Sequence, residues 1–153
     1  MIAHDRIEDV PVRRLIGLNG TFTKDTRSEI PALWDRWAYT TVTNVTRPDL
    51  VFGVSHNFAP GQFDYMCALE VSNDAIVPDG MTELLIPGGD YAVFVHDGHV
   101  SGIGAIFDAI ICGDTKVDGY RSRPTPQLEV YGEGFDPSTA TGLVELWFPV
   151  ERG

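Results

Sequence analysis

Carboxylates and large aromatic rings alternate with aliphatic residues near the end of the chain, in the stretch LEVYGEGFDPSTATGLVELWFPV (residues 128–150). Glu129 and Tyr131 alternate with apolar residues in its first half, and Glu145 and Trp147 do so in its second half. Side chains along a strand point alternately to the two faces of a sheet, so a hairpin here predicts one face that carries the acids and rings. A carboxylate beside aromatic rings can bind a cation, because the ring faces add a cation–π attraction to the ion pair.

The same carboxylates are candidates for acid–base chemistry. A carboxylate walled by rings loses hydration, which raises its pKa toward the range useful to a general base. Glu129 or Glu145 would then activate a water for hydrolysis, and a tyrosine hydroxyl would donate to the developing oxygen charge. The alternative is that both acids lie on a solvated sheet face, beside aromatic rings that only cover the sheet.

Length, composition and charge narrow the classes of protein. A chain of 153 residues with 43% hydrophobic and 22% charged residues predicts a single globular domain over residues 1–153. The net charge of -11 argues against direct nucleic-acid binding, since a phosphate backbone would be repelled. No apolar run approaches the ~18 residues of a membrane helix and no signal peptide opens the chain, so we expect a cytoplasmic protein and no membrane contact.

Motifs for metals, cofactors and nucleophiles are missing from the sequence. Cys67 and Cys112 both lie in apolar runs and are predicted to be small buried hydrophobes. His4, His96 and His99 lack metal-ligand spacing, and the glycine-rich pieces lack a phosphate-loop pattern. We therefore predict no metal site and no cofactor.

Hydrophobic periodicity and turn residues divide the chain into strands and helices. Residues 10–22 predict a strand ending at a glycine turn, and residues 28–42 predict a helix with Ser28 as N-cap and Pro31 in its first turn. Two strands joined by a turn at residues 59–62 follow. The same order then recurs, as extended structure around Gly88 and Gly89, a helix and two final strands, over the ranges 81–98, 99–111, 127–133 and 142–150.

This recurrence predicts a duplicated βαββ unit. Apolar residues of the two helices match at a constant offset of 70 residues, with Ile30, Leu33 and Trp37 aligned to Val100, Ile103 and Phe107. The repeats span about residues 8–73 and about residues 81–150. We expect an α+β fold, in which the two units form one mostly antiparallel sheet with two helices on one face and a central ligand cleft on the other.

The expected faces of the last hairpin follow from this arrangement. If its aliphatic residues pack against the helices, then its acids and rings lie on the opposite face. The residues expected toward the helices are Leu128, Val130, Val144, Leu146 and Phe148, and those expected in the cleft are Glu129, Tyr131, Glu145 and Trp147.

The sequence resembles the GyrI-like small-molecule-binding domain family, which also forms the effector-binding half of AraC-type and multidrug-responsive regulators. The matching pieces span nearly the whole chain in family order: VPVRRLIGLNGTF with IPALWDRW, VFGVSHNF with FDYMCALEV, PGGDYAVFVHDGHV, and YGEGFDP with VELWFPV. The resemblance implies a pseudo-two-fold pair of βαββ modules with a central cleft for hydrophobic, often cationic compounds.

The resemblance also implies roles for individual residues. Glu129 matches the acid of the family's Glu-x-Tyr pattern, which counters ligand charge, and Trp147 takes the aromatic place in the last strand. Some stand-alone members that resemble this chain are hydrolases of strained cyclopropane-bearing natural products and use the same cleft. Two departures are that no helix-turn-helix region is recognisable and that glycines and ICGDT occupy the second helix, where relatives carry bulky aromatics.

Four further residues are candidates for the ligand site. Phe52 and His56 alternate on the strand equivalent to the one that carries Glu129, so they would line the other side of the cleft. Tyr65 and Tyr91 are either cleft rings or core residues. Three functions stay open: binding of a hydrophobic or cationic small molecule, hydrolysis of a strained xenobiotic, and interaction with a partner protein that it shields.

Overall fold

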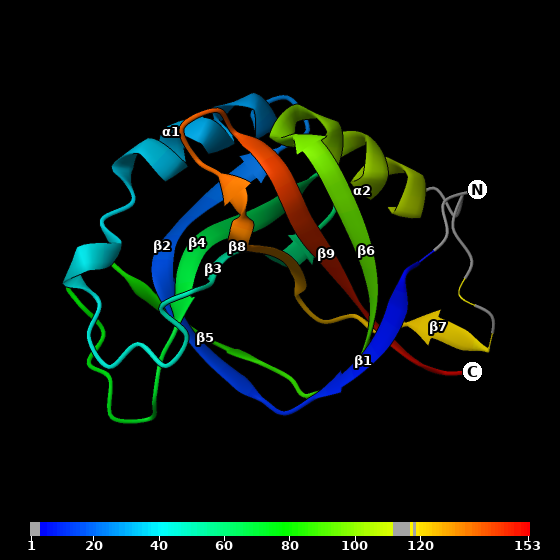
Figure 1. Cartoon of the computed structure of the whole chain (residues 1–153), viewed down its shortest axis with the longest axis horizontal. Helices are drawn as coiled ribbons and strands as arrows, with labels where there is room; N and C mark the ends of the chain where they lie inside the picture. Colours follow the sequence, from blue (N-terminus) through cyan, green and yellow to red (C-terminus); the bar gives the residue numbers. More distant parts are fainter. Residues whose placement is uncertain (1–3, 112–116, 118) are drawn as a thin grey trace.

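The computed structural model describes residues 4–111, 117 and 119–153 and shows an α+β fold with one large antiparallel sheet (Figure 1). Cys112 lies outside the described residues, whereas Cys67 is buried as predicted. In chain order the elements are β1 (Arg6–Val10), β2 (Arg13–Thr23), η1 (Arg27–Glu29), α1 (Ile30–Arg36), η2 (Tyr39–Thr41), β3 (Val51–Ala59), β4 (Gln62–Glu70), β5 (Thr82–Ile86), β6 (Gly89–His99), η3 (Val100–Gly102), α2 (Ile103–Ile111), β7 (Tyr120–Ser122), β8 (Gln127–Asp136) and β9 (Thr141–Arg152).

The strand order confirms the predicted βαββ pair. The sheet runs β1-β6-β9-β8-β3-β4-β2-β5, and β7 pairs with β9. The orders β2-α1-β3-β4 and β6-α2-β8-β9 are the same, and the two units join through β3 and β8 at the centre of the sheet. Each unit also carries as its edge the strand that precedes the other unit in the sequence, because β1 pairs with β6 and β5 pairs with β2.

The first predicted strand differs from the structure in its bounds. β2 continues through Gly17 and Gly20 to Thr23, and it does not end at a glycine turn. Gly17 is required by a close backbone contact, since a Cβ there would lie 1.8 Å from the carbonyl oxygen of Cys67 on β4. The preceding strand β1 was not predicted from the sequence.

The first helix is shorter than predicted. Ser28 lies in η1 and is not the N-cap of α1, because Glu29 holds that position without a side-chain hydrogen bond. Pro31 does lie in the first turn. The chain becomes extended at Trp37, so α1 covers only seven residues and buries Leu33 alone.

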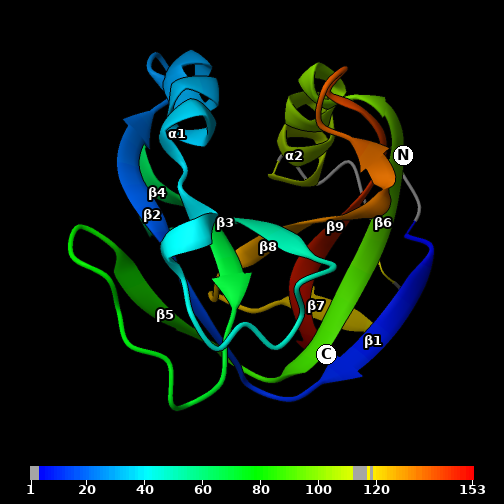
Figure 2. The ribbon, with the colours of Figure 1, turned by 60° about the vertical axis from the view of Figure 1, so that its left-hand side comes forward.

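Both helices pack on the same side of the sheet, over different halves (Figure 2). α1 covers the half formed by β2 and β4, where Leu33 packs with Ile16 and Cys67. α2 covers the half formed by β6 and β9, where Ile103 packs with Phe94 and others. A third core cluster fills the opposite, inward-curled face of the sheet; its members include Phe52, Val54, Tyr91, Leu128, Val130 and Trp147.

The register of the last hairpin corrects the predicted faces. Glu129 lies directly opposite Leu146, and Glu145 lies directly opposite Val130. Residues directly opposite each other in an antiparallel pair share a face, so the two acids lie on opposite faces of the sheet. β9 has the predicted orientation, but β8 is reversed: Glu129 and Tyr131 lie on the helix side. The alternation of side chains could not decide which face of β8 meets the helices, because both faces of these central strands are buried.

Candidate functional site

A buried carboxylate bound by two tyrosines lies on the helix side of the sheet. Glu129 is 7% exposed, and its Oε1 accepts hydrogen bonds from the hydroxyls of Tyr65 at 2.9 Å and Tyr131 at 2.5 Å. The other oxygen, Oε2, has no hydrogen-bond partner within the described part of the chain. The structure thus brings together three of the predicted site residues.

Burial dominates the electrostatics of this group. Loss of hydration raises the pKa of Glu129, although the hydrogen bonds from both tyrosines oppose the rise. Burial and the neighbouring Glu129 carboxylate raise the pKa of the Tyr65 and Tyr131 hydroxyls, which therefore stay protonated and donate. Burial likewise raises the pKa of the Cys67 thiol, so no thiolate competes for the site.

Gly53 provides the space for the carboxylate. It lies directly opposite Glu129 in the pairing of β3 with β8. A Cβ at this position would lie 2.2 Å from the Tyr65 hydroxyl oxygen and 3.0 Å from Glu129 Oε1. The hydrogen-bonded group therefore depends on the missing side chain at Gly53.

Two further aromatic rings complete the surroundings of Glu129. Trp34 on α1 donates from Nε1 to the Tyr65 hydroxyl at 3.3 Å and lies edge-on to Tyr131, with 5.5 Å between ring centroids. Phe135 packs edge-on against Tyr131 at 4.8 Å. Neither was predicted as a site residue, and Trp34 is the one that a signal in the sequence could have indicated. Its place one position after the buried Leu33, and hence about 100° around the helix, was the available signal.

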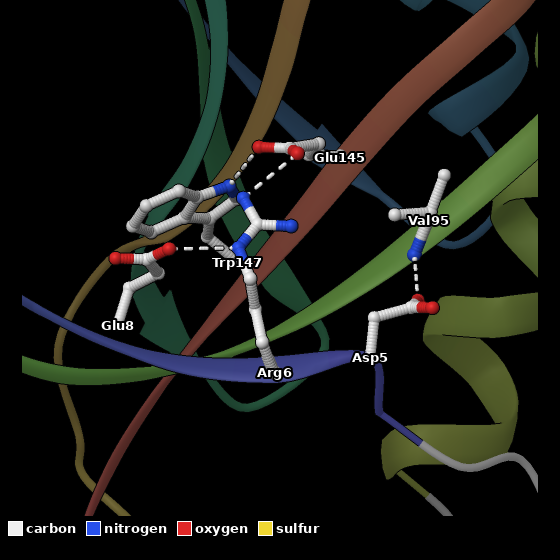
Figure 3. Close-up of polar contacts among 6 residues, drawn as sticks. All are labelled: Asp5, Arg6, Glu8, Val95, Glu145 and Trp147. Carbon is white, nitrogen blue, oxygen red and sulfur yellow. Dashed lines mark hydrogen bonds and ion pairs between the residues drawn. The ribbon is translucent and has the colours of Figure 1, made fainter.

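Glu145 and Trp147 form a separate cluster on the opposite face (Figure 3). Arg6 on β1 donates from Nη2 to Glu145 at 2.8 Å and from Nε to Glu8 at 2.8 Å. The Trp147 indole donates to Glu145 at 3.1 Å. The guanidinium carbons of Arg6 and Arg13 lie 5.9 and 5.1 Å from the Trp147 ring centroid. The chain therefore supplies its own cations to this acid and ring.

The remaining predicted ligand residues also lie on this opposite face, away from Glu129. Phe52 and Tyr91 are fully buried in its core, and the Tyr91 ring packs 5.8 Å from that of Trp147. The Tyr91 hydroxyl donates to the carbonyl of Pro87 at 2.7 Å. The predicted set of eight residues is thus divided between two faces, with Glu129, Tyr65 and Tyr131 on one of them.

His56 belongs to a polar network at one end of the same opposite face. Its Nε2 lies 2.8 Å from Asn19 Oδ1, and Asn19 in turn donates to Asp64 at 3.3 Å. Since the Asn19 amide nitrogen is used by Asp64, His56 donates from Nε2. Burial lowers the pKa of His56, and the charge of Asp64 only partly offsets this.

This network predicts an acid-sensitive contribution to stability. In the unfolded chain, His56 takes up a proton as the pH falls through its ordinary pKa of about 6.5, whereas folded His56 stays neutral to a lower pH. The free energy of unfolding therefore falls as the pH drops below about 6.5. The His56→Gln variant should lose this part of the pH dependence of the free energy of unfolding. Urea unfolding of both proteins between pH 7.5 and 5.5 measures it, and parallel pH curves for the two proteins would contradict it.

A surface pocket of about 330 Å³ includes neither Glu129 nor Glu145 in its lining. Its lining consists of Asp9, Gly89, Asp90, Arg123, Val150, Glu151 and Arg152. The Arg123 guanidinium is occupied there by backbone carbonyls of Val150, Gly88 and Asp90. Among the described helices, none is long and apolar enough to cross a membrane.

Known structures share this fold. SAV2435, solved with bound tetraphenylphosphonium, superimposes with a TM-score of 0.70 at 18% identity, over 95% of this chain and 93% of that one. An integron cassette protein of Vibrio cholerae has a TM-score of 0.66 at 16% identity, over 95% of each chain. A hydrolase from Listeria innocua has a TM-score of 0.54 at 14% identity, over 95% of this chain and 91% of that one.

Sequence comparison gives the family. The transcriptional regulator BrlR of Pseudomonas aeruginosa is 28% identical over 152 residues, which are 96% of this chain and 55% of the regulator. The chain thus spans about half of the length of that relative. Residues 6–150 match the family described as integron-associated effector binding protein. The chain belongs to this family of small-molecule effector-binding proteins, as the GyrI-like resemblance predicted.

Proposed function

We propose that the chain binds a hydrophobic organic cation between α1 and the centre of the sheet, with Glu129 as the countercharge. The observation that carries the proposal is the Glu129 carboxylate, buried among rings with Oε1 occupied and Oε2 without a described partner. An ionised carboxylate in such a place lacks much of the hydration that would stabilise its charge. A cation that displaces the remaining water would supply the missing stabilisation.

The surrounding rings determine the class of cation. Trp34, Tyr131 and Phe135 provide aromatic surface within one connected cluster. Such rings attract a diffuse organic cation by roughly 0.5 to 2 kcal/mol each, and they bury its apolar parts. A small, strongly hydrated ion would gain less from the rings and would lose its water. SAV2435, which shares the fold, was solved with tetraphenylphosphonium, a cation of this class.

The dependence of affinity on pH tests the proposed charge pairing. Because burial raises the pKa of Glu129, the carboxyl stays neutral to a higher pH than that of an exposed glutamate. Affinity for tetraphenylphosphonium should therefore rise as the pH increases through this raised pKa and level off when Glu129 is ionised. Isothermal titration calorimetry from pH 4.5 to 8 measures the dependence.

The matched control for this titration is an uncharged ligand. Triphenylphosphine oxide presents similar rings without a positive charge, so its affinity should change little over the same pH range. The same pH dependence for both ligands, or no binding of tetraphenylphosphonium by the wild type, would contradict the proposal.

A second candidate function is hydrolysis with Glu129 as general base. It is favoured by the raised pKa of Glu129 and by its second oxygen, Oε2, which has no hydrogen-bond partner in the described part of the chain and could accept a proton from water. Glu145 is a weaker candidate, because Arg6 and Trp147 already donate to it. Mass spectrometry of a cyclopropane-bearing alkylator incubated with the protein tests this. A hydrated product that disappears in Glu129→Gln but persists in Glu145→Gln would support it.

A further inference from the structure

An ion pair links the segment that leads into α1 with α2. In η1, Arg27 Nη1 lies 3.1 Å from one carboxylate oxygen of Asp108 on α2, and Nη2 lies 3.5 Å from the other. Arg27 also reaches over the start of α2, since a Cβ added at Gly104 would lie 3.9 Å from its Nη2. The two residues are 81 positions apart and belong to different βαββ units. The pair therefore joins η1, which leads directly into α1, to α2 of the other unit.

α1 positions a ring over the carboxylate. Trp34 contacts both tyrosines that hydrogen-bond Glu129, through its indole N–H to Tyr65 and edge-on to Tyr131. With Trp34 in this position, Glu129 is only 7% exposed. Because Glu129 is only 7% exposed, a ligand of several rings needs the surrounding rings to move before it can contact the carboxylate, and Trp34 is the ring that α1 carries.

α1 is short and only partly buried. It covers seven residues and has no side-chain N-cap hydrogen bond; Leu33 is its one fully buried residue, and Ile30 and Trp34 are partly buried against the core. A helix of this length has little stability of its own, so its position depends on tertiary contacts. The Arg27–Asp108 pair lies just before the first turn of α1, where a contact limits the motion of the helix most directly.

We propose that the Arg27–Asp108 pair is a latch that holds α1 and Trp34 over Glu129, and that the latch opens when a ligand enters. The ligand part of this inference rests on the proposed cation-binding function, whereas the closure of α1 does not. The two side chains are 40% and 57% exposed. Exposed ion pairs are weak and are screened by salt, so this latch opens readily and more often at high ionic strength.

Hydrogen–deuterium exchange of the ligand-free protein tests the latch. Arg27→Asp and Asp108→Arg should each speed amide exchange in residues 30–36, by about two- to fivefold for the lost ion pair and more where the new like charges repel. The double variant Arg27→Asp/Asp108→Arg restores an ion pair of opposite polarity, so its exchange should return toward that of the wild type. Unchanged exchange in both single variants, or no recovery in the double variant, would overturn the latch.

A matched control uses an exposed ion pair elsewhere. Arg121 on β7 pairs with Glu151 on β9 at 2.9 Å, and both side chains are exposed. Arg121→Gln should leave exchange in residues 30–36 unchanged, whereas Arg27→Gln should raise it. Equal effects of the two variants would show general destabilisation and would count against the latch.

Association kinetics connect the latch to the ligand. Stopped-flow Trp fluorescence with tetraphenylphosphonium should give a faster association rate for Arg27→Gln than for the wild type, by about the factor seen in exchange. The charge-swapped double variant has the net charge of the wild type, so its rate separates opening of the latch from electrostatic steering. If the wild type does not bind this cation, the proposed function fails, and the exchange experiment still decides the latch.

Discussion

Replacing Glu129 by Gln should weaken tetraphenylphosphonium binding at neutral pH by about 10- to 100-fold, which is roughly 1.4 to 2.8 kcal/mol. The amide has nearly the shape of the carboxylate, and its oxygen can still accept the hydrogen bonds of Tyr65 and Tyr131. The variant thus removes the charge and keeps the rings. Isothermal titration calorimetry at constant salt measures the loss.

The matched control is Glu145→Gln on the opposite face. Glu145 is bound by Arg6 and Trp147, so its removal should change the affinity by less than about twofold, within the usual effect of a distant surface substitution. Thermal unfolding checks whether Glu129→Gln has a folding defect. We expect this variant to be at least as stable as the wild type at neutral pH. The reason is that the raised pKa of Glu129 reflects a cost of ionisation in the folded state. Equal losses of affinity in the two variants would refute the assignment of Glu129.

Gly53→Ala should lower the free energy of unfolding by about 2 to 3 kcal/mol, as overpacking of a tight core position does. The added Cβ would lie 2.2 Å from the Tyr65 hydroxyl, so Tyr65 must move and its hydrogen bond to Glu129 is strained or lost. That leaves a buried carboxylate with one hydrogen bond fewer. Urea unfolding at neutral pH measures the change.

Gly104→Ala is the control for this substitution. Gly104 lies within α2, and a Cβ there would meet only the end of the Arg27 side chain at 3.9 Å. The same change should therefore stabilise the protein, by up to about 1 kcal/mol from helix propensity. A loss of less than about 0.5 kcal/mol in Gly53→Ala would contradict the steric role of Gly53.

Local signals in the sequence predicted most of the fold. The turn at residues 59–62, the alternation in β3, β4, β8 and β9, and the helical spacing around Leu33 were sufficient for the βαββ pair. β1 and β7 were missed because a short, charged edge segment such as RIEDV has no buried stripe of its own. β1 is held instead by long-range contacts, including that of Arg6 with Glu145.

The site was only partly predictable, because it depends on strand register. Glu129 was a candidate from the sequence, but its hydrogen bond to Tyr65 joins residues 64 positions apart. The face of β8 could not be read from alternation, since Leu128 and Val130 are buried inside the curled sheet as fully as a helix-facing residue would be. Gly53 lies opposite Glu129 and leaves room for its carboxylate, but this could be recognised only once the pairing of β3 with β8 was known.

The position of a bound cation tests the central claim most directly. Tetraphenylarsonium has the shape and charge of tetraphenylphosphonium, and its arsenic atom can be located by anomalous diffraction from a crystal of the complex. We expect the arsenic peak on the helix side of the sheet, with its phenyl groups against Trp34 and Tyr131 and within about 6 Å of the ring centroids. A peak beside Trp147 and Glu145 on the opposite face, with none near Glu129, would contradict the proposed site.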